Sequence, residues 1–241
     1  MEQRRKRRKT KAERQREVRR NRIILIIIVV TLILTAGVGI WKSFFKKQAV
    51  ESSTDNPDML PEDSIEWIGA PNITADLLTP NENSRPQTAL HQIKGIVIHY
   101  TANPGSTAKD NRDYFESLKD SQENQVSSHF IVGLEGEIIQ CIPTSEVAYA
   151  SNDRNSDTIS IECCHPDESG QFNQSTYASM VQLTGWLCVR FDVPVTEVIR
   201  HYDVTGKLCP KYFVEHEDAW AQFCADVQSK IDEITQERAN Q

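Results

Sequence analysis

The amino-acid sequence predicts an α/β domain, with a mixed central β-sheet flanked by helices, preceded by a single N-terminal transmembrane helix. Short apolar runs of strand length alternate with stretches of helical spacing over residues 89–241. An apolar run of nineteen residues without a charge, 23–41, precedes them. Residues 1–50 hold 15 Lys and Arg against 3 Asp and Glu, a charge of +12, whereas residues 51–241 hold 12 against 31, a charge of -19. The two parts of the chain therefore suit different electrostatic surroundings.

The N-terminal region has the pattern of a membrane anchor. Residues 4–22 hold twelve Lys or Arg. As a helix, the run 23–41 would be about 28 Å long, which matches the hydrocarbon core of a bilayer. Because the basic excess lies upstream, the positive-inside rule places residues 1–22 in the cytoplasm and everything after the span outside. The sequence thus predicts a single-pass protein of the cell membrane, with an extracytoplasmic domain after the span.

Two other interpretations of this region remain open from the sequence. A cleaved signal peptide has an apolar region of about 7–15 residues, followed by a small-residue cleavage motif. The run here is longer and no clean A-x-A motif follows it, which favours an uncleaved anchor. The basic segment 4–22 could bind nucleic acid. Beside a membrane span, such a segment more often orients the span and contacts anionic lipids, so we expect a membrane partner and no nucleic acid.

Residues 42–88 are predicted to form an extracytoplasmic stalk. The segment is mostly polar and holds five prolines. We expect its apolar stretch, 65–73, to dock on the domain that follows. Over the whole chain, hydrophobic residues make up 39% and charged residues 25%, which excludes a collagen-like or wholly disordered protein.

The domain at 89–241 is predicted to combine strands with helices. Apolar runs predict strands, and two of these are joined into a hairpin by a turn bracketed by Gly133 and Gly136. Stretches with apolar residues every three or four positions predict helices. The predicted strands are 93–100, 129–134, 137–142, 158–163 and 197–201, and the predicted helices are 106–118, 174–191 and 215–237.

Candidate metal ligands follow from the positions of two histidines and a cysteine. His99 and His201 end predicted strands and enter loops, where α/β sheets place their sites. Cys209 lies eight residues after His201, so the loop can bring its thiol back beside that imidazole. Two imidazoles and a thiolate suit Zn²⁺ and leave a fourth position for water. Taken singly, such residues are more often structural, since a lone cysteine is usually a small buried hydrophobe.

Four segments in sequence order carry a family resemblance: IVIHYTANPGS, SSHF, ISIEC and RHYDVTGKLCPKYF. Over about residues 90–215, they resemble the zinc-dependent N-acetylmuramoyl-L-alanine amidases, relatives of phage lysozyme-type amidases and of peptidoglycan recognition proteins. The segment HYDVTGKLCP is the most specific, because it sets His, Lys and Cys at fixed offsets. The resemblance implies the peptidoglycan-amidase fold and hydrolysis of the amide between N-acetylmuramic acid and L-alanine in bacterial peptidoglycan.

The resemblance also implies roles for individual residues. His99, His201 and Cys209 correspond to the ligands of one zinc ion. Lys207 corresponds to the lysine that faces the scissile carbonyl, and Glu162 to the proposed general base. The chemistry is consistent, since zinc lowers the pKa of bound water towards about 7. A lysine can then share the charge of an oxyanion with the metal, and a glutamate can carry a proton from the water to the leaving amine.

Three further residues are expected to contact substrate. His129 in the SSHF segment is one, with a hydrogen-bonded core histidine as the equal alternative. Tyr149 lies where many bacterial relatives have a W-H-A segment, and Asn155 belongs to the asparagine-rich loop that follows. The remaining histidines are expected at the surface: His91, His165 and His216.

We therefore expect a membrane-anchored cell-wall hydrolase with a monomeric catalytic domain. A peptidoglycan-binding receptor without catalysis is the alternative, because some recognition relatives keep the groove and lose the zinc ligands. The complete ligand set, together with a lysine and a glutamate, favours the enzyme. A zinc amidohydrolase or peptidase acting on another small amide is a third interpretation.

Overall fold

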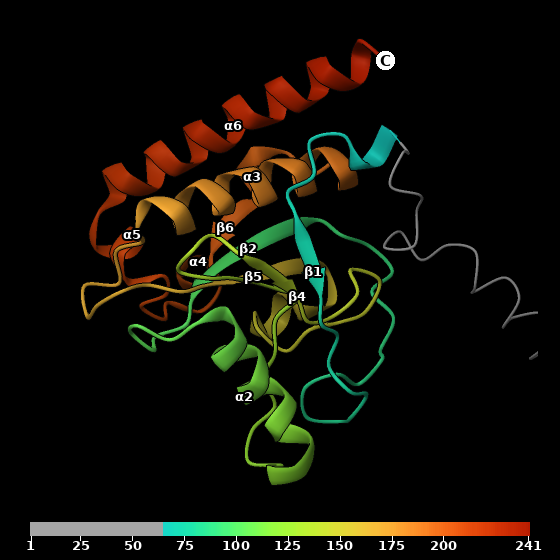
Figure 1. Ribbon diagram of the computed structural model, residues 1–241, viewed down its shortest axis with the longest axis vertical. Helices are drawn as coiled ribbons and strands as arrows, with labels where there is room; N and C mark the ends of the chain where they lie inside the picture. Colours follow the sequence, from blue (N-terminus) through green and yellow to red (C-terminus); the bar gives the residue numbers. More distant parts are fainter. Residues whose placement is uncertain (1–64) are drawn as a thin grey trace, which may run out of the picture. The chain divides into compact units, whose positions relative to one another are not determined.

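The computed structural model describes residues 65–241 (Figure 1). The basic segment 1–22, the apolar run 23–41 and residues 42–64 of the stalk lie outside this range, so the interpretations placed on them stay predictions. Within residues 65–241, no helix combines the length and the apolar character needed to cross a bilayer.

In the described part of the chain, the strands form a six-stranded mixed sheet. The strands are β1 (Ile73–Ala75), β2 (Gly95–Tyr100), β3 (Phe130–Val132), β4 (Ile138–Gln140), β5 (Thr158–Cys163) and β6 (Val198–Arg200). Their order across the sheet is β1-β4-β3-β5-β2-β6, and neighbours are parallel except in the β3–β4 hairpin. The predicted mixed α/β sheet and its hairpin are confirmed, and β1 is an edge strand that the sequence did not predict.

Strand β2 lies between β5 and β6, and this position determines where the polar residues gather. Its residues from Gly95 to His99 are all buried, because strands flank it on both sides and helices cover both faces. A strand in this position is apolar throughout rather than alternating. The register with β5 sets His99 opposite Glu162, and β6 pairs with the other side of β2. The carboxyl ends of three parallel strands therefore meet at one edge of the sheet.

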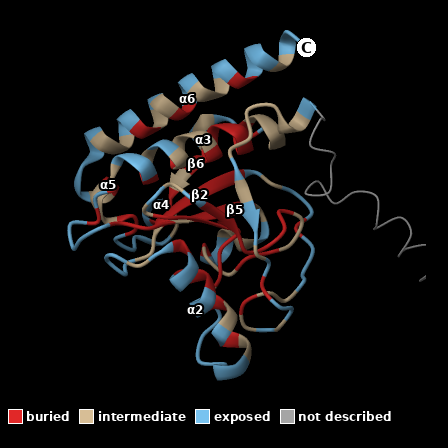
Figure 2. Ribbon diagram, in the orientation of Figure 1, coloured by how far each residue is buried: buried red, intermediate tan, exposed pale blue. Residues whose placement is uncertain are grey.

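Helices cover both faces of the sheet. Helices α3 (Gln174–Phe191) and α6 (Glu217–Ala239) lie together on one face, and α2 (Ala108–Ser121) lies on the other (Figure 1). Strand β3 contributes to both interiors, since Phe130 packs in the core beneath α3 and α6, whereas Ile131 packs in the smaller core beneath α2. The strands are the most buried part of the molecule, and the exposed residues of the helices face outward (Figure 2).

Two predicted elements end at other residues, for local reasons. The helix predicted at 215–237 is α6, which begins and ends two residues later. The short helix α5 (Lys211–Glu215) precedes it and was not predicted, and the backbone of His216 (φ -130°, ψ 82°) leaves the helical region between the two. The strand predicted to reach 201 stops one residue earlier, and α4 (His201–Thr205) begins there. The Asp203 carboxylate accepts a hydrogen bond from the Arg200 N–H at 2.8 Å, which fixes this helix start.

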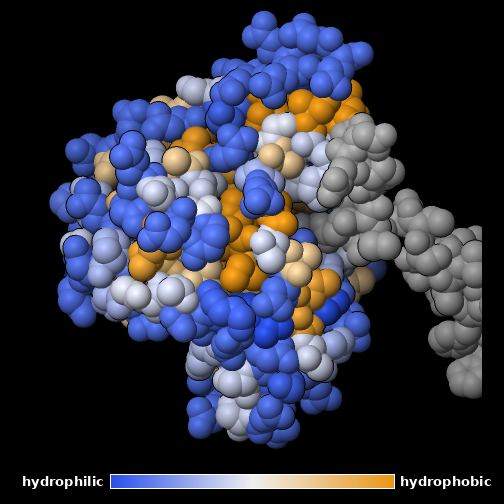
Figure 3. Space-filling view, in the orientation of Figure 1, coloured by the Kyte–Doolittle hydropathy of each residue, from blue (hydrophilic) through white to orange (hydrophobic). Residues whose placement is uncertain are grey.

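The segment before β1 crosses the C-terminal ends of α3 and α6, and we call residues 65–70 the N-terminal strap. Trp67 stacks on Trp186 of α3, with ring centroids 5.3 Å apart. The Trp186 indole N–H donates to the Glu66 carbonyl at 2.9 Å, and Arg238 of α6 donates to the same oxygen at 2.7 Å. Apolar side chains are visible beneath the C-terminal end of α6 (Figure 3). The predicted docking of this apolar stretch on the domain is confirmed.

Candidate metal centre and active site

The polar residues at the sheet edge come from three elements. His99 is the penultimate residue of β2, Glu162 is the penultimate residue of β5, and His201 begins α4 directly after β6. The loop that follows α4 closes through a hydrogen bond from the Tyr202 N–H to the Cys209 carbonyl, at 2.9 Å. This closure returns the cysteine to the histidine, as the eight-residue spacing predicts.

His99, His201 and Cys209 form one buried cluster. One potential ligand atom of each residue lies within 4.8 Å of the other two. The Nδ1 atom of His99 is 3.8 Å from Cys209 Sγ, and the two imidazole centroids are 4.7 Å apart. The structure thus brings together the three residues that the sequence singled out, at a spacing that one small cation can bridge.

Hydrogen bonds determine which imidazole nitrogens face the thiol. The Nε2 atom of His99 lies 3.2 Å from Ser151 Oγ, and the Nε2 atom of His201 lies 3.0 Å from Asn152 Oδ1. The buried Nδ1 atom of His201 has no hydrogen-bond partner among the described residues. Two Nδ1 atoms and one sulfur are therefore left as donors to a cation. This nitrogen and sulfur set fits Zn²⁺.

Burial keeps the metal-free cluster uncharged. Burial lowers the pKa of His99 well below 6.5 and also lowers the pKa of His201, and nearby positive charge lowers both further. Burial raises the pKa of the Cys209 thiol to about 12, although the Tyr100 backbone N–H and Lys207 act in the opposite direction. At pH 7 the imidazoles can bind a metal as they are, and the thiol would lose its proton to the solvent on binding.

Glu162 is a further buried polar group at this edge. Its Oε1 atom is 4.0 Å from His99 Nδ1, and its Oε2 atom is buried without a hydrogen-bond partner within residues 65–241. Burial raises the pKa of this carboxyl to about 8, and Lys207 opposes that rise. Because burial also keeps His99 neutral, the two side chains are not an ion pair at pH 7. A carboxyl group that titrates near neutrality can accept and return a proton.

Lys207 lies in the exposed loop between α4 and α5. Its positive charge lowers the pKa of Glu162, His99 and His201, so it acts on the whole cluster. Gly206 has a φ of +77° and ends α4, which turns the chain so that Lys207 follows outside the helix. A cation in this place can stabilise negative charge that develops on a substrate.

Residues 89–212, about half of the chain, match the family model described as N-acetylmuramoyl-L-alanine amidase. The chain belongs to the N-acetylmuramoyl-L-alanine amidase family. The amidase CwlL of Bacillus licheniformis is 32% identical over 172 residues, which cover 66% of this chain and 47% of that protein. The amidase BlyA of Bacillus subtilis (strain 168) is 30% identical over 179 residues, with the same coverage of 66% and 47%. The chain spans about half the length of these curated relatives.

Solved structures from similar proteins have the same fold. The structure of PlyL is 26% identical, with a TM-score of 0.57, and the match covers 65% of this chain and 97% of PlyL. The PlyG catalytic domain is 26% identical, with a TM-score of 0.58 and coverage of 67% and 96%. The described part of the chain is therefore an amidase-type α/β domain with a central mixed sheet.

Two buried histidines of this amidase domain lie apart from the metal cluster. His129 is 1% exposed, and its Nδ1 and Nε2 atoms lie 3.0 Å from Ser160 Oγ and 2.9 Å from the Glu146 carbonyl. It has the contacts of a hydrogen-bonded core histidine, and a role for it in binding substrate stays a prediction. His165 is also 1% exposed, and its ring packs against Tyr100 with centroids 5.1 Å apart. The prediction of a surface position for His165 is wrong, because the turn that follows β5 is buried and packs this ring against Tyr100.

The other predicted substrate residues lie in the loop before β5. Asn155 Oδ1 accepts hydrogen bonds from the backbone N–H groups of Ala150, at 3.0 Å, and Ser151, at 2.5 Å. This oxygen is therefore used to order the loop that reaches the cluster. Tyr149 is half-buried, and its backbone N–H donates to Ser127 Oγ at 3.0 Å. A role for the Tyr149 and Asn155 side chains in binding substrate stays a prediction.

Arg200 stabilises the segment that carries His201, a role that the sequence analysis did not predict. Its guanidinium donates to the Phe213 carbonyl at 2.9 Å and forms ion pairs with Asp203 at 2.9 Å and Glu217 at 2.7 Å. These contacts tie β6 to α4, α5 and α6 next to His201. The sequence signal that could have identified Arg200 is its position directly before His201, in the segment RHYDVTGKLCPKYF.

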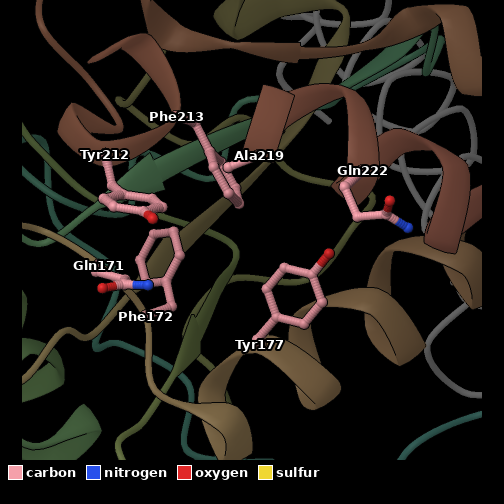
Figure 4. A pocket seen from close by; sticks show the side chains of 7 residues that line it. All are labelled: Gln171, Phe172, Tyr177, Tyr212, Phe213, Ala219 and Gln222. Carbon is pink, nitrogen blue, oxygen red and sulfur yellow. The ribbon is translucent and has the colours of Figure 1, made fainter. Parts of the chain in front are cut away.

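A separate pocket of about 230 Å³ lies between the start of α3 with the segment before it, helix α5 and the start of α6 (Figure 4). Aromatic rings surround it, and its lining is Gln171, Phe172, Tyr177, Tyr212, Phe213, Ala219 and Gln222. The hydroxyl of Tyr177 is held by the Asp226 carboxylate at 2.7 Å. The lining contains no imidazole, thiol or carboxylate, so the chemistry of an amidase belongs to the cluster and not to this pocket.

Proposed function

We propose that the chain is a zinc-dependent N-acetylmuramoyl-L-alanine amidase, which hydrolyses the amide between N-acetylmuramic acid and L-alanine in bacterial peptidoglycan. The observation that carries the proposal is the buried set of His99, His201 and Cys209, with ligand atoms within 4.8 Å. Glu162 stands beside this set in the register of the sheet. Family membership and the names of the relatives support the substrate class.

The residues present fit a zinc ion. The Nδ1 atoms of His99 and His201 and the thiolate of Cys209 would hold it, and the unpartnered state of His201 Nδ1 is an independent reason to place a cation there. Zinc bound at this position supplies a Lewis acid that polarises the scissile carbonyl and makes water a competent nucleophile near neutral pH.

Glu162 is placed to move the proton of the reaction. As a carboxylate, it would accept a proton from the attacking water while the water oxygen bonds to the carbonyl carbon. It would then donate that proton to the amide nitrogen as the C–N bond breaks, which releases the amine of L-alanine. Lys207 would stabilise the negative charge that develops on the carbonyl oxygen.

The proposal includes the location of the enzyme. The run 23–41 behind the basic segment 4–22 would hold it in the cell membrane, with residues 1–22 in the cytoplasm and a monomeric catalytic domain outside. Peptidoglycan as substrate agrees with that side of the membrane. Protease added to intact protoplasts should remove a C-terminal tag and leave an N-terminal tag protected, and the reverse pattern would contradict this topology.

The enzyme itself is tested by comparing wild-type residues 60–241 with the Glu162→Ala variant. Both should contain one zinc per chain. The wild type alone should release, from purified peptidoglycan, stem peptides that begin with the free amine of L-alanine, as identified by mass spectrometry. Zinc without release by the wild type would contradict the amidase and favour a binding receptor. A wild type without zinc would contradict the metal centre.

A further inference from the structure

The two candidate histidine ligands are contacted by consecutive residues of one loop. Ser151 Oγ lies 3.2 Å from Nε2 of His99, and Asn152 Oδ1 lies 3.0 Å from Nε2 of His201. The histidines come from different elements, β2 and α4, and the contacts span 52 and 49 positions of the chain. One short loop therefore determines the orientation of both rings.

This loop is ordered by its own hydrogen bonds. Asn155 Oδ1 accepts the N–H groups of Ala150 and Ser151, and the Arg154 N–H donates to the Ser151 carbonyl at 3.0 Å. Asn152 begins the 3-10 helix that follows, with a φ of +53°, in the left-handed region where asparagine is tolerated better than most residues. Ser151 is 1% exposed. The backbone that carries both oxygens is thus ordered by contacts other than those to the histidines.

We propose that Asn152 is a positioning residue that keeps the proton of His201 on Nε2, so that its Nδ1 lone pair is available to the metal, and that Ser151 orients the ring of His99. This inference rests on the proposed function, since it concerns the zinc that the amidase would use. A carbonyl oxygen can only accept, so Asn152 Oδ1 requires a proton on Nε2 of His201. A neutral imidazole carries one proton, so its Nδ1 is then a bare donor atom.

The opposite amide orientation would give a different centre. If the Asn152 amide nitrogen faced the ring, it would donate to Nε2 and the proton would move to Nδ1. A neutral His201 could not then bind a metal through Nδ1 without first changing its tautomer. Partners of this kind that fix a ligand histidine typically contribute about 10–100-fold to metal affinity.

Variants of Asn152 separate positioning from simple packing. Asn152→Gly removes the acceptor and tolerates the positive φ, whereas Asn152→Asp keeps an acceptor oxygen in the same place. Gln122→Gly is the matched control, because Gln122 has a φ of +55° at the exposed end of α2, away from the cluster. The full chain in detergent would be titrated with zinc against a chromophoric chelator. We expect the zinc Kd to rise about 10–100-fold for Asn152→Gly, not to rise for Asn152→Asp, and to stay unchanged for Gln122→Gly.

Two spectroscopic measurements read the histidines directly. The visible spectrum of the cobalt-substituted chain should change for Asn152→Gly but not for Gln122→Gly. In the metal-free wild type, side-chain ¹H–¹⁵N correlation should show His201 protonated on Nε2. Protonation of His201 on Nδ1 in the wild type, or a wild-type zinc Kd for Asn152→Gly, would overturn the proposal. These outcomes do not depend on amidase activity, so a chain that binds zinc but leaves peptidoglycan intact would contradict the proposed function alone.

Discussion

His129 and His201 are both buried, and burial lowers the pKa of each, but their hydrogen bonds indicate different roles. Both ring nitrogens of His129 lie within hydrogen-bond distance of the protein, at Ser160 and the Glu146 carbonyl. His201 has one nitrogen engaged, by Asn152, and a second buried nitrogen without a partner in the part of the chain that is described. Burial therefore does not separate a core histidine from a metal ligand. What separates these two is that His201 keeps one nitrogen unused by the described residues and lies beside His99 and Cys209.

The largest effect should come from removing the ligand histidine. His201→Ala should lower zinc affinity by more than the hundredfold that is typical for loss of a supporting residue, and activity on peptidoglycan should fall in parallel. The free energy of unfolding of the metal-free chain should change by only about 1 kcal/mol, because the lost ring has few partners. Zinc titration and urea unfolding measure the two effects. Normal zinc content in this variant would contradict the ligand assignment.

The next largest effect should come from the cation beside the cluster. Lys207→Ala should lower kcat by about 10²–10³-fold, the usual effect of losing one group that stabilises an oxyanion. Zinc content should stay at the wild-type level, because the ammonium group is not one of the donors. Lys207→Arg should restore part of the rate. Equal losses of zinc and activity in Lys207→Ala would instead show a structural role for this loop.

The pH dependence of stability should distinguish His129 from an ordinary surface histidine. Burial lowers its pKa from 6.5 to about 4, so between these values the unfolded chain binds a proton that the folded chain does not. Stability should therefore fall as the pH drops from about 6.5 to 4. Compared with His129→Gln, which hydrogen-bonds without titrating, the metal-free wild type should lose about 3 kcal/mol over this interval. Parallel pH profiles for the two proteins would contradict the buried, neutral state of His129.

The smallest of these effects should be the cost of removing the core histidine at neutral pH. His129→Ala leaves Ser160 and the Glu146 carbonyl without this partner, so the free energy of unfolding should fall by about 2 kcal/mol. Zinc affinity and activity per folded molecule should remain at the wild-type level, in contrast to His201→Ala. Urea unfolding followed by an assay at a temperature where both proteins are folded tests this. A specific loss of activity would restore His129 as a substrate residue.

The sequence predicted the parts of this molecule that depend on local patterns. The apolar runs gave β2 and β5, the two glycines gave the hairpin turn, and the eight-residue spacing brought Cys209 back to His201. Each of these is determined by residues close together in the chain, or by the paired ends of parallel strands. The same reasoning separated the candidate ligands from most other histidines before any contact was known.

The parts that were missed depend on contacts between distant segments. The sequence could not show that His165 is covered, since that depends on how the turn after β5 packs against Tyr100. It could not show that Asn152 meets His201 across 49 positions. Which nitrogen of an imidazole is used is a property of the assembled fold. For that reason, the two alternatives for His129 had equal weight before its contacts were known.

The N-terminal strap has a consequence for the choice of recombinant fragments. The family match begins at residue 89, but the strap and β1 lie before it and contact α3, α6 and β4. A fragment cut at residue 89 would uncover one face of Trp186 and leave β4 as an open strand edge, which is a template for aggregation. A fragment intended for crystals or for zinc titration should therefore begin upstream of Ile65.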